Sequence, residues 1–456
     1  MGGGMDSQSE CFIFFGLIMV LLAAAVQQMM PSPPATCVGI DLGTTFSCVA
    51  VYDDGEITVI NNRGKSITPS VLFQPPDDGN LIVGEGARAA AAATLGGTLI
   101  YDAKRFIGKP YVHETVLREA RGLPFEVVPG LSTVRDQLEP HLQFEAGGQR
   151  IRLSPEDVGT LVVHNLKLAA EELIGRSVEN AVLAVPVGFN RKQINATKQA
   201  AVNAGFNVLR TIHEPTAAAM AYGLHTRPQV NTVMVYDIGG GTLDVSLLDL
   251  SNGIFTVMAA AGDNRLGGQD FNLVLLEHLV EVVGARMPDG SPPLTSDPEA
   301  MRALREEAER IKIELNDEAD CSGRFDSDDP AETEVRLPAS LAAAGPLTVD
   351  RAVFERLAAP LLERALRPVH EVLKKVEMRQ EDVDELVLVG GSSRMARIRQ
   401  LLRDHFGDRE PNCDVSPEEA VAHGTAIQAA ILTDRKKISV GATEAALHTH
   451  LEGVER

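Results

Sequence analysis

Two segments far apart in the chain share one design that could bind a phosphate group. Residues 38–52 read VGIDLGTTFSCVAVY and residues 233–248 read VMVYDIGGGTLDVSLL; each has an apolar strand, an aspartate, a turn of glycine and threonine, and a second apolar strand. Such a turn gathers backbone N–H groups and hydroxyls on one concave face, and glycine lets an anion approach closely. One turn of this kind is as often only a turn, but two matching turns could hold phosphates from opposite sides.

Three aspartates accompany these turns and could position a cation. Asp41 and Asp237 precede the two turns, and Asp244 follows Thr242 by two residues. Mg²⁺ prefers oxygen ligands and keeps most of its water molecules, so carboxylates around those waters suit this ion. For Asp244 alone a solvated strand residue would be the favoured interpretation, but its place beside the second turn favours the site.

Lys104 and Glu214 are candidates for the chemical step. Lys104 lies in YDAKRFIG, and a lysine near a transferred phosphate neutralises developing charge. Beside Arg105, a lysine is more often simply solvated. Glu214 opens EPTAAAMAYG at a predicted strand-to-helix junction, where it could orient an attacking or metal-bound water. The alternative is a carboxylate that stabilises the start of a helix.

A third glycine turn could bind a nucleoside. Gly390 and Gly391 follow an apolar strand, and they would let a flat adenosine lie against the backbone while Arg394 stacks on the purine. Glu309 and Lys312 share one face of a predicted helix at 306–315 and could reach ribose hydroxyls. An ordinary surface pair is the alternative for these two residues.

The pattern around these residues predicts alternating strands and helices that would position them. Strands are predicted at 36–40, 47–51, 57–61, 181–185 and 208–212. A helix is predicted between Ser154, as N-cap, and Gly175, and further helices at 191–204 and from Thr216. Because the hairpin design occurs twice, the pattern indicates one duplicated domain. Residues 317–345 resemble a surface excursion or weak hairpin.

Composition restricts the class of protein. The 456 residues suffice for two or three domain cores, and a net charge of −21 disfavours nucleic acid as a partner. The five cysteines include no C-x-x-C pair, which argues against a zinc site. The four beyond residue 36 are predicted to be small buried hydrophobic residues rather than a disulfide framework.

The N-terminus carries an uncharged apolar run at residues 11–26. Its length suits the core of a signal peptide, with an uncleaved membrane anchor as the alternative. Any membrane contact is expected only through this segment. The C-terminal GVER is not a KDEL-type retention tag.

Taken together, these segments resemble the heat shock protein 70 chaperone family. The matching stretches run in order from Val38 to Leu432: GIDLGTT, YDAKRFIG, AVPVGF, HEPTAAAMAYG, DIGGGTLDVSLL, LGGQDFN, LVLVGGSSRM and SPEEAVAHGTAIQAAIL. The resemblance implies an α/β fold, the actin-like and hexokinase-like two-lobed ATPase fold with a duplicated ribonuclease-H-like core. It also implies slow hydrolysis of ATP to ADP with Mg²⁺ and K⁺.

The resemblance assigns roles residue by residue. The implied catalytic residues are Lys104, Glu214, Asp237 and Thr242, and the metal-ordering acids are Asp41, Asp237 and Asp244. The implied nucleotide-binding residues are Gly43, Thr44, Thr45, Gly239, Gly240, Gly241, Glu309, Lys312, Gly391, Ser392 and Arg394. Co-chaperones and nucleotide exchange factors are the implied partners.

Several positions depart from the family pattern. Ile313 stands where most members have an arginine that packs on adenine, Asn316 replaces a serine, and Glu418 replaces an aspartate. Gly188 and Ile194 replace a tyrosine and an arginine of a relay that links co-chaperones to catalysis.

The resemblance also predicts a domain arrangement and a location. Residues 1–35 would be the signal peptide or anchor, 36–227 lobe I, completed by 413–432, and 228–412 lobe II. An irregular tail at 433–456 would follow, with no peptide-binding domain, and the location would be the endoplasmic reticulum or microsomes.

Three hypotheses for function follow. The first is an ATPase core that acts as a nucleotide-dependent conformational switch without binding peptides. The second is a catalytically weakened nucleotide-binding scaffold or regulator of other chaperones. The third, a small-molecule kinase on the same fold, is disfavoured because EPTAAAMAYG and LGGQDFN match chaperones and not sugar kinases.

Overall fold

The computed structural model describes residue 19 and residues 37–433, apart from 54, 77–79, 95, 122, 132–136, 252, 318, 322 and 326–331. The predicted signal or anchor segment, except residue 19, and residues 434–456 of the predicted tail lie outside this part of the chain. Within the described part, no helix combines the length and apolar character needed to cross a membrane.

The first sheet is built around the first hairpin. β1 (Cys37–Leu42) and β2 (Phe46–Asp53) pair antiparallel, and β3 (Glu56–Val59) continues the meander. β11 (Asn180–Val185) lies parallel to β1, and β12 (Asn207–His213) lies parallel to β11. The order is therefore β12-β11-β1-β2-β3. The apolar residues of β1 and β11 are buried on both faces, as expected of strands inside a sheet covered by helices.

The second sheet repeats this plan. β13 (Thr232–Ile238), β14 (Leu243–Ser251) and β15 (Ile254–Asp263) form an antiparallel meander, and β18 (Glu385–Val389) lies parallel to β13. A parallel bridge from Val387 to Asn412 stands where the first sheet has its fifth strand. The shared strand order confirms the duplicated core and the two-lobed fold class predicted from the sequence. Lobe I denotes here the part around the first sheet, and lobe II the part around the second.

Helices cover both sheets. In lobe I these are α4 (Pro155–Ile174), with the predicted Ser154 cap and Gly175 end, and α5 (Arg191–Asn203). In lobe II they are α7 (Gly268–Arg286), α8 (Pro298–Glu314), α9 (Arg351–Lys375) and α10 (Ala396–His405). Two predicted starts are wrong: the helix predicted from 216 begins at Glu214, and the helix predicted at 306–315 begins at Pro298. In each case a proline early in the first turn extends the helix towards its N-terminus.

Smaller elements surround the two cores. In lobe I they are β4 (Thr68–Pro69), β5 (Leu72–Gln74), β6 (Ile82–Val83), α2 (Glu85–Ala93), β7 (Thr98–Ile100), the short 3₁₀ helix η1 (Ala103–Arg105), α3 (Glu114–Glu119), β8 (Glu126–Leu131), β9 (Leu138–Ala146) and β10 (Gln149–Leu153). In lobe II, β16 (Glu332–Glu334) pairs with β17 (Thr348–Asp350), so residues 332–345 of the predicted excursion belong to a hairpin.

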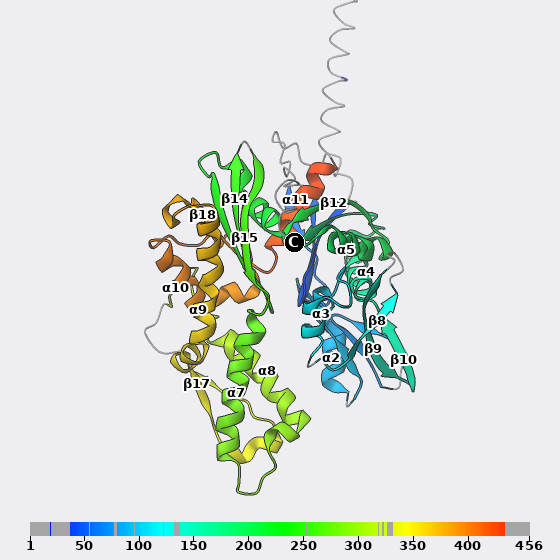
Figure 1. Cartoon of the computed structure of the whole chain (residues 1–456), viewed down its shortest axis with the longest axis vertical. Helices are drawn as coiled ribbons and strands as arrows, with labels where there is room; N and C mark the ends of the chain where they lie inside the picture. The colour runs from blue at the N-terminus through cyan, green and yellow to red at the C-terminus, as the bar shows by residue number, and fades with distance from the viewer. Residues whose placement is uncertain are drawn as a thin grey trace, which may run out of the picture.

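Two helices join the lobes. α6 (Glu214–Ala221) and α11 (Ala420–Leu432) share one apolar core with residues of both sheets, and Figure 1 shows α11 in the upper part of the molecule between the lobes. A Cβ atom on Gly424 would lie 1.7 Å from the Ala217 carbonyl oxygen, so only glycine lets α11 cross α6 this closely. Gly39 plays the same part on the other side, because its Cβ would lie 2.1 Å from the Ala426 nitrogen. The residue limits given above for the two lobes stay a prediction.

The cysteines correct one prediction. Cys37 and Cys48 are buried and free, as expected, but Cys321 and Cys413 form a disulfide across 92 residues of sequence. The bond joins the segment after α8 to the segment after α10. Scattered spacing concealed this pair, because the two residues meet only when the second sheet and its helices have packed.

Candidate functional site

The two matching turns meet where the lobes face each other. The first turn follows β1 and the second follows β13, and a Cβ atom on Gly240 would lie 2.5 Å from Thr45 Oγ1. The second turn is closed by the Gly239 N–H, which donates to the Thr242 carbonyl at 3.0 Å. On the first turn, the Ser70 hydroxyl donates to the Gly43 carbonyl at 2.8 Å. The two predicted anion cradles are therefore neighbours.

The three aspartates lie at the ends of the strands that carry these turns. Asp237 and Asp244 face each other across the β13–β14 pairing, whereas Asp41 faces Cys48 across the β1–β2 pairing. Asp41 and Asp237 are half-buried, and Asp244 is the most exposed of the three. The carboxylates of both lobes thus border one polar centre.

Burial, and then crowding by neighbouring acids, raises the pKa values of these three aspartates. Burial, and then Glu214, raise the pKa of Asp41 to about 7, although Lys104 opposes the rise. Burial and the neighbouring acids also raise the pKa of Asp237 well above its usual value. The pKa of Asp244 rises to about 6, because surrounding protein displaces much of its water and Glu214 is near, with Lys104 again opposing.

Lys104 and Glu214 form an ion pair at this centre. Lys104 Nζ lies 2.9 Å from Glu214 Oε1, and the two side chains are only 10% and 14% exposed. Lys104 lies in η1, and Glu214 is the first residue of α6, held at the end of β12. Burial lowers the pKa of Lys104, but Glu214, Asp41 and Asp237 together raise it above its usual value, so the ammonium keeps its charge.

The donor set fits a hydrated magnesium ion. Four acids, Asp41, Asp237, Asp244 and Glu214, surround one lysine, so the fully ionised centre carries an excess of negative charge that a divalent cation would offset. In the described part of the chain, no three His, Cys, Asp or Glu side chains converge closely enough to hold a metal directly. Mg²⁺ that keeps its waters suits this arrangement, because carboxylates can then act through those waters.

Part of the predicted adenosine site lies beside the second turn. The Ser392 hydroxyl donates to the Gly239 carbonyl at 2.8 Å, and Lys312 Nζ donates to the Gly268 carbonyl at 3.2 Å. A Cβ atom on Gly268 would meet both Ser392 Oγ and Lys312 Nζ, so these two side chains converge at this point. Burial lowers the pKa of Lys312, while Glu309 opposes that change.

Glu309 and Arg394, the remaining charged residues of the predicted adenosine site, are engaged in ion pairs. Glu309 lies 3.3 Å from Arg88 of α2 in lobe I, and Arg394 donates to both carboxylate oxygens of Glu418 at 2.7 Å. Burial raises the pKa of Glu418, but the opposing effect of Arg394 is larger, so the pKa lies below its usual value. Ile313, where the family resemblance led us to expect an arginine, is 53% exposed beside Lys312.

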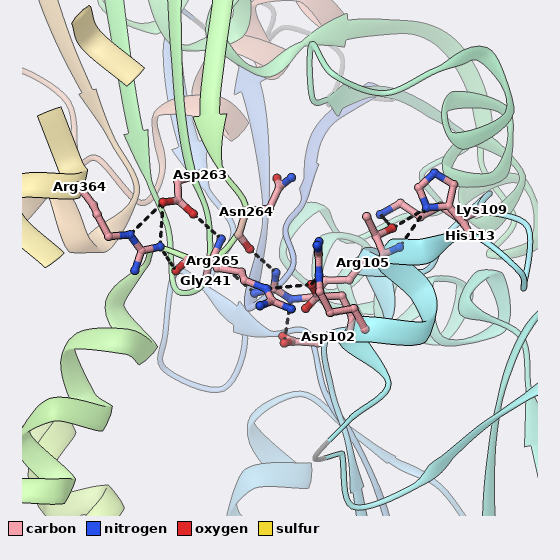
Figure 2. A network of polar contacts seen from close by, with 12 residues as sticks. Asp102, Arg105, Lys109, His113, Gly241, Asp263, Asn264, Arg265 and Arg364 are labelled. Atoms are coloured by element: carbon pink, nitrogen blue, oxygen red, sulfur yellow. Dashed lines mark hydrogen bonds and ion pairs between the residues drawn. The ribbon is translucent and has the colours of Figure 1, made fainter. Parts of the chain in front are cut away.

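The sequence pattern predicts Arg105 only as a solvated neighbour of Lys104. In the structure its guanidinium donates to the carbonyls of Gly241 and Asn264 in lobe II and to Asp102 beside it (Figure 2). The one signal in the sequence was its position next to Lys104, which says nothing about a partner in the other lobe.

Comparison with known proteins shows the family of the chain. A family model described as "Hsp70 protein" matches residues 37–441. The chain is also 41% identical over 431 residues to the heat shock 70 kDa protein BIP3 of Oryza sativa subsp. japonica, a match that covers 92% of this chain and 60% of the relative. The chain thus spans about 60% of the length of the curated relative that it matches. Because the family model covers most of the sequence and places it on the fold described above, the chain belongs to the Hsp70 family.

Proposed function

We propose that this chain binds ATP between its lobes and hydrolyses it slowly to ADP. The observation that supports the proposal most directly is the meeting of two phosphate-binding turns around the Lys104–Glu214 pair. Thr44, Thr45 and the glycines at 239–241 would contact the phosphates, and Lys312, Ser392 and Arg394 would hold the adenosine. The domain limits and the individual residue roles are part of this proposal.

The chain's own groups account for a hydrolytic step. Lys104 keeps its positive charge and can neutralise charge that develops on the terminal phosphate. Glu214 fixes the ammonium by its 2.9 Å contact and can orient an attacking water with its other oxygen. Asp41, Asp237 and Asp244 would hold the waters of Mg²⁺, which supplies charge neutralisation at the phosphates when bound. A requirement for K⁺ rests on the family resemblance alone.

The output of hydrolysis would be a change in lobe angle that a partner protein reads. Lobes joined by two crossing helices can rotate about that junction, as in other nucleotide switches. Co-chaperones and nucleotide exchange factors are the proposed partners, and the endoplasmic reticulum is the proposed location.

A weakened scaffold is the second candidate, because Ile313 is exposed beside Lys312 and Arg394 is bound to Glu418. Either feature would lower the affinity of the site for adenine.

Single-turnover hydrolysis by the full chain, with Mg²⁺ and K⁺, tests the proposal. Lys104→Ala should slow the chemical step by about 100-fold or more, since it removes one charge from the transition state. Arg150→Ala, which removes an arginine that is 72% exposed on β10, is the matched control and should keep the wild-type rate. ATP that binds the wild type but is never cleaved would contradict the enzyme and favour the scaffold.

A further inference from the structure

Arg105 connects the two lobes immediately beside the proposed catalytic lysine. Its Nη1 donates to the Asn264 carbonyl at 2.9 Å, and its Nη2 donates to the Gly241 carbonyl at 3.2 Å. Figure 2 shows the side chain reaching from η1 in lobe I to the lobe II strands and turn. The side chain is only 13% exposed, so water competes little for the part-buried bond to Gly241, whereas the bond to the Asn264 carbonyl lies open to solvent.

Asp102 fixes the direction in which Arg105 points. The Arg105 Nε donates to Asp102 Oδ2 at 2.9 Å, and Asp102 is itself 14% exposed. A guanidinium presents its donors in a rigid planar fork, so a carboxylate on Nε leaves both terminal nitrogens aimed at the other lobe. A lysine has no such fork and could not make all three contacts in this geometry.

The groups that receive Arg105 are also held in place within lobe II. Asn264 lies in the turn after β15, where Arg364 donates to Asp263 Oδ2 and to the Arg265 carbonyl, both at 2.8 Å (Figure 2). Gly241 belongs to the second phosphate turn, and a Cβ atom there would lie 2.0 Å from Arg105 Nη2. Glycine at 241 therefore serves the approach of Arg105 as well as that of a phosphate.

The Arg105 side chain is more buried than the arginines of two cross-lobe ion pairs. The pair of Arg88 with Glu309 spans 3.3 Å with side chains 42% and 36% exposed, and Arg265 lies 3.5 Å from Glu119 with Arg265 53% exposed. Exposed pairs of this kind contribute little to a conformational equilibrium. Of these three contacts, Arg105 is the one with the burial and geometry to bias the lobe angle.

We propose that Arg105 is a positioning residue that latches the lobes together. With its bonds to Gly241 and Asn264 in place, it holds the second phosphate turn close to Lys104, its neighbour on η1. When lobe II moves away, the two bonds break, and the phosphate turn and the lysine separate together. The latch thus joins lobe closure to competence for hydrolysis, and in this respect the inference rests on the proposed function.

Arg105→Gln in the full chain tests the latch, because it removes the guanidinium that donates to both lobe II carbonyls. We expect single-turnover hydrolysis to slow and ADP release to accelerate, each by about tenfold, because two bonds from a charged donor are lost. Both rates in Arg105→Lys should lie between those of Arg105→Gln and those of the wild type. Arg265→Ala, which removes an arginine from the same interface, should change either rate by about twofold at most. Thermal unfolding midpoints monitor whether each variant folds.

Amide hydrogen exchange without nucleotide tests the latch independently of any turnover. The amides of residues 239–242 and 263–268 should exchange faster in Arg105→Gln than in the wild type. In Arg265→Ala their exchange rates should equal those of the wild type. Unchanged exchange in folded Arg105→Gln would overturn the latch, as would equal effects of the two substitutions. Absence of hydrolysis by the wild type would instead overturn the proposed function, while the exchange result would still decide the latch.

Discussion

Replacing Asp41 by asparagine probes the electrostatic cost of the site. In the folded chain burial and Glu214 raise the pKa of this carboxyl from 3.8 to about 7, with Lys104 in opposition. The unfolded chain loses the proton at its ordinary pKa, near 4. Between about pH 4 and pH 7 the folded state therefore binds more protons than the unfolded state, and its stability falls as the pH rises through this range.

The size of this cost follows from the two pKa values. The difference between 3.8 and about 7 corresponds to about 4 kcal/mol at pH 8. Asp41 is only half-buried, and solvent screening reduces the expected cost to about 2 kcal/mol. Asp41→Asn should therefore stabilise the chain by about 2 kcal/mol at pH 8 and by only about 1 kcal/mol at pH 5, where the unfolded chain has already lost this proton but the pH is still below the folded pKa.

Urea unfolding at pH 5 and pH 8, without Mg²⁺ or nucleotide, measures this difference as a shift in midpoint. Glu145→Gln, at a carboxyl that is 76% exposed on β9, is the matched control and should leave the pH dependence as in the wild type. A lower midpoint for Asp41→Asn at pH 8, or the same shift at both pH values, would refute the reasoning. Slower hydrolysis by the more stable variant would show that the acid is kept for function.

Two further predictions concern the framework around the site. Gly424→Val should lower the free energy of unfolding by about 3 kcal/mol or more, because its side chain must displace the Ala217 carbonyl where α11 crosses α6; thermal unfolding measures this, and an unchanged midpoint would contradict the close crossing. Replacing Cys321 and Cys413 by serine should cost up to about 4 kcal/mol, because the bond closes a loop of 92 residues. Dithiothreitol should lower the urea midpoint of the wild type and leave that of the double variant unchanged; equal stability of the two proteins would argue against the bond.

The two hairpins and the helix after Ser154 could be read directly from the sequence. The apolar runs, the Asp-x-Gly turns, the capping box of Ser154 with Asp157 and the glycine at 175 are all local features. Their preferred conformations depend on neighbours a few residues away, so short-range sterics and hydrogen bonding determine them. The repeated design also indicated the duplicated core, because two similar segments fold by the same local rules.

The partners of individual side chains were decided by the tertiary structure alone. Arg105 and the Gly241 carbonyl, which form a hydrogen bond, are separated by 135 residues in the sequence. The Cys321–Cys413 bond and the Arg394–Glu418 pair likewise join separate segments. Residue types and spacing do not encode which of many possible donors and acceptors become neighbours. That choice is made when the two lobes pack on α6 and α11, because the burial of one shared apolar core fixes the distances of every polar group around it.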